Sequence, residues 1–121
     1  MILRAEHDPD GARSALQEAL RTGRRIGAKR NMADAILGLA CLAGDLGDWQ
    51  RAAALHGAAR ALLDQTGVRW DAFTVEIRQE SLDQAGAALG DEQFQRAYAR
   101  GMALSFDQAL NLALDGIPPS T

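Results

Sequence analysis

Apolar residues recur three or four positions apart along almost the whole chain. This spacing places them on one side of a helix, and short stretches rich in Gly and Asp separate the periodic segments. The pattern predicts six helices, which begin near Asp8, Asn31, Asp48, Trp70, Asp91 and Ser105. Strand formers are scarce between these segments, so we expect an all-α chain.

Several helix ends carry recognisable capping residues. Asp8 is a suitable N-cap, and Pro9 suits the first helical position that follows it. Gly27 is a natural stop for the first helix, since glycine tolerates the left-handed conformation that commonly ends helices. Ser105 and Gln108 form a capping box at the start of the sixth helix.

The predicted helices differ in how much apolar surface they carry. The second is uncharged on every face from Ala35 to Ala43, so we expect it to be buried on several sides. The first and fourth helices each have one apolar stripe, and Ile26 and Phe73 belong to these stripes. The charged side chains of the fourth helix, Arg78 among them, are expected to face water.

One helical unit is nearly repeated. Residues 8–27 realign with residues 48–67, and a weaker echo begins at Leu89-Gly90-Asp91. A period of this length is typical of stacked helical hairpins, and the short connections favour antiparallel neighbours. We predict one domain over residues 1–116 and a flexible tail over 117–121. The first helix lacks a hairpin partner, so we expect the chain to be a fragment of a larger protein or to self-associate.

Composition narrows the class of protein. The net charge is −3, which argues against direct contact with nucleic acid. The single Cys41 fits a reducing cytoplasm. No signal peptide is visible, and the longest apolar run, Ala35 to Gly44, is too short for a membrane span. We therefore expect a cytoplasmic protein that contacts neither membrane nor nucleic acid.

The second and third predicted helices resemble a tetratricopeptide repeat. The matching residues are Leu37, Gly38, Cys41, Gly47, Trp49, Ala52 and Ala59. The sequence departs from the family where Asp34 occupies the position of a Trp, and where the turn is about two residues longer. The match covers residues 8–67 best, and it implies that the helical hairpins form a right-handed stack.

The whole chain also resembles the helical C-terminal region of large actinobacterial regulators. Those proteins join an ATPase module to tetratricopeptide-like helices, often with a LuxR-type or winged-helix DNA-binding domain. Residues 46–59 and 89–105 carry this resemblance. It implies signal-dependent transcriptional control through protein contacts. This chain has neither a Walker motif nor a DNA-reading helix, so those two activities are not implied.

The sequence offers few groups for catalysis. His56 lies on the apolar stripe of the third helix and Cys41 in the most apolar helix, and both are expected to be core residues. A Cys–His nucleophile pair is a weak alternative, because no orienting carboxylate accompanies it. His7 is given no role. We predict no catalytic residue, no cofactor and no metal site, and hence no enzyme.

The densest charged feature is a basic cluster, formed by Arg21, Arg24, Arg25, Lys29 and Arg30. It has two interpretations: a solvated helix end that compensates the macrodipole, or a contact for an acidic partner surface or a phosphate. The predicted function is a non-catalytic protein-interaction or sensory module of a transcriptional regulator. Its partner would be another protein, other domains of the same polypeptide, or a second copy. The alternative is a domain that binds a small-molecule effector in an apolar pocket near Cys41 and His56.

Overall fold

The computed structural model describes residues 9–115. Within this range the chain forms six α-helices and no strand, which confirms the predicted all-α class. The helices are α1 (Pro9–Ile26), α2 (Lys29–Asp45), α3 (Trp49–Thr66), α4 (Ala72–Leu89), α5 (Asp91–Met102) and α6 (Phe106–Asp115). His7, Asp8 and the predicted tail lie outside the described residues.

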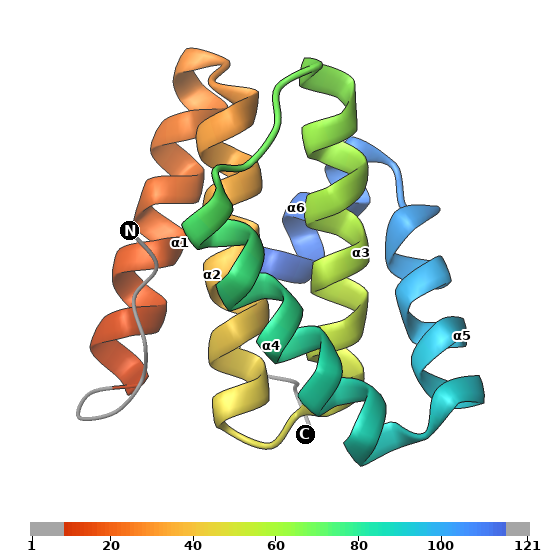
Figure 1. The fold of residues 1–121 in the computed structure, drawn as a ribbon. Coiled ribbons are helices and arrows are strands. Elements are labelled where there is room, and N and C mark those ends of the chain that lie inside the picture. Colours follow the sequence, from red (N-terminus) through yellow and green to blue (C-terminus); the bar gives the residue numbers. More distant parts are fainter. Residues whose placement is uncertain (1–8, 116–121) are drawn as a thin grey trace.

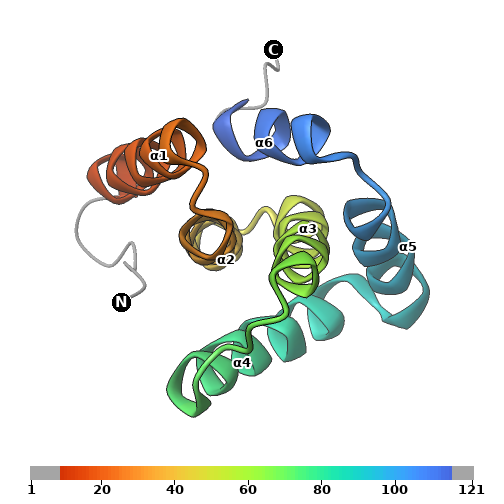
Figure 2. The same ribbon diagram turned by 90° about the horizontal axis from the view of Figure 1, so that it is seen from above.

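Two helices form the centre of the molecule. Seen from above, α2 and α3 are encircled by an arc of α1, α6, α5 and α4 (Figure 2). The first three helices follow one another in antiparallel order, whereas α3 and α5 run in the same direction (Figure 1). Helix α3 packs closely on α2 and α5, and it contacts its chain neighbour α4 less extensively. The finer prediction of a right-handed tetratricopeptide-like stack stays a prediction.

The core is built on α2. Its residues from Met32 to Gly44 are buried except Asp34, as the uncharged stretch predicted. The largest fully buried side chains come from four helices, and they include Leu20, Ile36, Leu37, Leu55 and Leu110. Burying each such side chain contributes about 1.5–3 kcal/mol, so packing on α2 is the main source of stability.

Small residues bring α3 and α5 into backbone contact. A Cβ atom added to Gly101 would lie 2.7 Å from the carbonyl carbon of Ala54. A Cβ atom added to Gly57 would lie 3.1 Å from the carbonyl carbon of Tyr98. Two glycines on facing helices therefore allow an approach that no larger residue permits at these positions.

The predicted helix ends are mostly correct. Asp48 caps α3 by accepting the Arg51 N–H at 3.3 Å. Ser105 and Gln108 form the predicted reciprocal capping box at α6, with bonds of 2.9 and 3.1 Å. The predicted start at Asn31 is wrong: α2 begins two residues earlier and has no side-chain cap.

Three predictions of burial are wrong. Ile26 and Phe73 are each 66% exposed, and Arg78 is partly buried instead of facing water. Helix α4 crosses the α2–α3 pair obliquely (Figure 1), so it contacts the core through Ser81 and Ala85. Its apolar residues are spread around the axis, and the sequence alone could not indicate which side faces inward. None of the described helices is long and apolar enough to cross a membrane.

Candidate functional site

The predicted basic cluster forms one end of the molecule. Three of its arginines lie on the last turns of α1, and the other two residues lie on the first turn of α2. The turn at Gly27, with φ of 74°, brings the two helix ends together. All five side chains are exposed to solvent. We call this surface, made of Arg21, Arg24, Arg25, Lys29 and Arg30, the basic end.

The partners of the basic end hold it weakly. Arg24 lies 3.8 Å from Asp107 at the start of α6. Arg30 lies 3.9 Å from Asp34. Such exposed pairs contribute only about 0–1 kcal/mol each. Arg25 has no partner among residues 9–115, so these cations are available to an external anion.

Exposed apolar side chains accompany the charges. Ile26, 66% exposed, follows directly on Arg25. The Lys29 ammonium donates to the Gln65 side-chain oxygen at 3.4 Å, which places the end of α3 beside this turn. Val68, 42% exposed, follows three residues later. The basic end therefore combines positive charge with apolar surface.

A second feature is a buried polar contact between α3 and α4. His56 is fully buried, and its Nε2 shares a hydrogen bond of 2.8 Å with Ser81 Oγ. The other ring nitrogen, Nδ1, has no hydrogen-bond partner among residues 9–115. Burial, together with the nearby positive charge of Arg78, lowers the pKa of His56 to about 3. The imidazole is thus neutral at physiological pH, which suits a structural contact.

Arg78 joins α4 to its neighbours. Its guanidinium group lies 5.3 Å from the Trp70 ring centre and 5.9 Å from the Tyr98 ring centre. Nη2 also donates to Tyr98 Oη at 2.6 Å. Trp70 in turn donates its indole N–H to Asp34 at 2.8 Å. Arg78 is therefore a structural cation–π residue, a role the sequence analysis missed.

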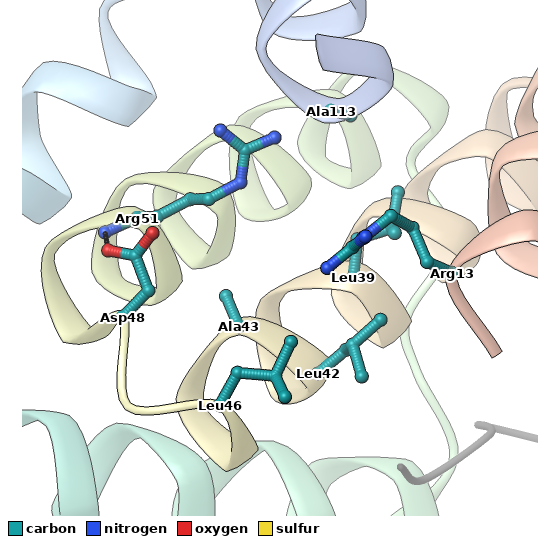
Figure 3. Close-up of a pocket in the computed structure, with 8 residues that line it drawn as sticks. All are labelled: Arg13, Leu39, Leu42, Ala43, Leu46, Asp48, Arg51 and Ala113. Carbon is teal, nitrogen blue, oxygen red and sulfur yellow. Dashed lines mark hydrogen bonds between the residues drawn. The ribbon is translucent and has the colours of Figure 1, made fainter. Parts of the chain in front are cut away.

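A third feature is a cavity of about 200 Å³ at the opposite end of α2 from the basic end. Four helices contribute to its lining, with Leu39, Leu42, Ala43, Leu46, Arg13, Asp48, Arg51 and Ala113 (Figure 3). Figure 3 shows Arg13 reaching from α1, and Arg51 from α3, toward the space between them. The cavity thus has an apolar floor and two cations at its rim.

Side chains that reach α6 shape this cavity. Arg51 Nη2 donates to the Leu112 carbonyl, and Gln17 donates to the Leu114 carbonyl at 3.1 Å. Carbonyl groups in the last turn of a helix lack intrahelical partners, so these bonds fix the end of α6. They hold Ala113 over the cavity.

The two residues considered for nucleophilic chemistry are both buried core residues. Cys41 is 1% exposed and lies in the core of α2. Neither Cys41 nor His56 lines this cavity. Among the described residues, no group of three or more His, Cys, Asp or Glu side chains could hold a metal ion.

These features define an all-α helical domain with a basic end and a small arginine-flanked cavity. No protein-family model matches the chain. No solved structure matches it at a significant level. It is 40% identical over 119 residues to two curated proteins, from Mycobacterium bovis and Mycobacterium tuberculosis, each named "Putative HTH-type transcriptional regulator". The alignment covers 95% of this chain and 13% of each relative, so the chain spans about 13% of their length.

The relatives correct one prediction. Their name is HTH-type, and helix-turn-helix proteins bind DNA, so the expectation of no direct nucleic acid contact is wrong. That expectation rested on a net charge of −3 summed over 121 residues. A sum over a chain that spans 13% of its relatives says nothing about the charge of the rest of those relatives. Phosphate contacts also depend on local clusters of cations, which a net charge averages away.

Proposed function

We propose that this chain is a non-catalytic protein-interaction module of a transcriptional regulator, and that its basic end contacts an acidic segment of a protein. The regulatory part of the proposal is supported by the names of the mycobacterial relatives. We further propose that residues 1–116 form one tetratricopeptide-like domain within a longer chain. The acidic segment would then belong to the same polypeptide or to a separate partner.

The observation that carries the proposal is the exposed Ile26 beside the weakly held cations of the basic end. An isolated exposed apolar residue needs no explanation. Here Ile26 follows Arg25 directly, and Val68 lies three residues after Gln65, the hydrogen-bond partner of Lys29. An acidic amphipathic helix offers both carboxylates and apolar side chains, and it can therefore satisfy both kinds of group at once.

The acids around the basic end favour protein over DNA as its partner. Asp34 and Asp107 lie within 4 Å of Arg30 and Arg24, and they reduce the local positive field. Duplex DNA presents a continuous line of phosphates, and these phosphates offer no apolar surface to Ile26. A helix with a few carboxylates needs fewer cations for binding than duplex DNA does, and its apolar side chains can cover Ile26.

Charge reversal tests the proposal. The probes are a fluorescent helical peptide of alternating Glu-rich and Leu-rich positions and a short DNA duplex, both followed by fluorescence anisotropy. Arg25→Glu is expected to weaken peptide binding about tenfold, since loss of a charged contact costs about 1.5–3 kcal/mol. Arg96→Glu on α5 is the matched control, because Arg96 contacts Glu92 far from this end. Equal peptide binding by both variants, or tighter binding of the duplex than of the peptide, would refute the proposal.

A further inference from the structure

We infer that the cavity between α1, α2, α3 and α6 binds a small apolar carboxylate. The inference rests on the lining of this cavity and does not depend on the basic end. Its floor is formed by Leu39, Leu42 and Leu46, and its rim carries Arg13 and Arg51 (Figure 3). This arrangement matches a ligand with an apolar body and one anionic group.

Arg13 is the clearest sign of a ligand. Its side chain is only 22% exposed, yet the ion pair it makes is with Asp10 on the same helix at 3.6 Å. The Asp10 side chain is 91% exposed, so water screens this pair almost completely. A largely covered arginine side chain with so weak a counter-ion favours an anion at the cavity.

Arg51 supplies the second cation from the opposite wall. It already donates to the Leu112 carbonyl. Its guanidinium charge adds to that of Arg13 at the cavity. The lining also includes Asp48, whose carboxylate accepts the Arg51 backbone N–H at 3.3 Å and is thereby directed at the start of α3. The residues that line the cavity thus include two arginines and one aspartate.

The volume sets the size of the ligand. A cavity of about 200 Å³ is somewhat larger than a dry engineered cavity of about 150 Å³ that holds benzene. It is smaller than the range of about 300–1,000 Å³ that suits drug-sized molecules. Benzoate and hexanoate have the right size: the ring or chain would pack on the leucines, and the carboxylate would lie between Arg13 and Arg51.

The test is calorimetric titration of the 121-residue chain with sodium benzoate and sodium hexanoate, alongside benzyl alcohol and 1-hexanol as uncharged analogues. Carboxylates are expected to bind at least about tenfold more tightly than the alcohols, a difference of about 1.4 kcal/mol, because hydrogen bonds to a charged group are the stronger ones. Arg13→Gln should abolish this preference and leave α6 attached, because Arg51 and Gln17 hold that helix. Arg96→Gln, an exposed arginine on α5, is the matched loss of charge and should bind like the unchanged chain.

A second variant tests the place of binding. Ala43 lines the cavity, and Ala43→Leu adds three carbon atoms there while keeping both arginines. It should reduce binding of carboxylates and alcohols alike, and circular dichroism checks that the variant folds. Should it not fold, amide chemical-shift changes that map to the cavity lining replace it. The inference is overturned by absence of saturable carboxylate binding, by equal affinity for the alcohols, or by Arg13→Gln behaving like Arg96→Gln.

Discussion

The glycine contact between α3 and α5 allows a quantitative test of the fold. A methyl group at Gly101 would lie 2.7 Å from the Ala54 carbonyl carbon, where ordinary contacts are 3.4–4 Å. Both partners are backbone atoms, so the helices must separate, and overpacking of this kind costs up to about 3 kcal/mol. Alanine recovers about 1 kcal/mol through its higher helix propensity. We therefore expect Gly101→Ala to lower the free energy of unfolding by about 2 kcal/mol.

Gly86 provides the matched control for this substitution. It also lies inside a helix, but a Cβ atom added there meets no atom within 4 Å. Gly86→Ala should therefore raise the free energy of unfolding by up to about 1 kcal/mol. Urea denaturation followed by circular dichroism measures both variants, and about 3 kcal/mol should separate them. Equal stability, or a more stable Gly101→Ala variant, would show that α3 and α5 are not in backbone contact.

Three further predictions concern polar contacts between the helices. Because the pKa of His56 is lowered from 6.5 to about 3, stability is complete above pH 6.5 and is lost as the pH falls below it. At pH 5 the free energy of unfolding, measured by urea denaturation, should be about 2 kcal/mol below its value at high pH. The His56→Gln variant should lack this part of the pH dependence. The same pH dependence in both proteins would contradict the lowered pKa of His56. Ser81→Ala leaves His56 Nε2 without its partner and should cost about 1–3 kcal/mol in the same assay; a change of a few tenths would mean that the bond contributes nothing. A double-mutant cycle of Trp70→Phe with Asp34→Ala should give a coupling energy of about 1 kcal/mol, and a value near zero would contradict the indole–carboxylate bond.

Local signals explain which parts of the fold could be predicted. Asp48, and Ser105 with Gln108, cap their helices through bonds to residues three positions away, so the sequence contains both partners. The uncharged stretch of α2 likewise reports directly on burial, because no face of that helix can meet water without cost. Helix existence and the central position of α2 follow from such information alone.

The orientation of α4 depends on contacts that no local pattern contains. The sequence predicted that Phe73 would be buried and that Arg78 would face water. In the structure Phe73 is exposed, and Arg78 packs against the Trp70 ring. The reversal arises because α4 crosses α2 and α3 obliquely, so that Trp70 and Tyr98 meet Arg78 instead of water. The sequence of α4 showed only that its apolar residues are spread around the helix axis, so it did not indicate which side faces the core.

Of the two candidate sites, only one could be predicted from the local sequence. The basic end was predictable, because its five residues lie within ten positions of one another. The cavity was not, because Arg13, Arg51 and Ala113 come from three distant segments. Only tertiary packing brings these segments together, so no spacing along the chain indicates the site.

Helix α6 connects the two candidate sites physically. Its first turn carries Asp107, which pairs with Arg24 of the basic end at 3.8 Å. Its last turn is held by Gln17 and Arg51 and places Ala113 on the cavity. A displacement of α6 would therefore change both surfaces. If each site binds as proposed, thermodynamic linkage requires that a carboxylate alter peptide affinity by the same factor as the peptide alters carboxylate affinity. A common factor different from one would show that the two sites are coupled, as a shared α6 predicts, whereas a factor of one would leave two independent sites on one scaffold.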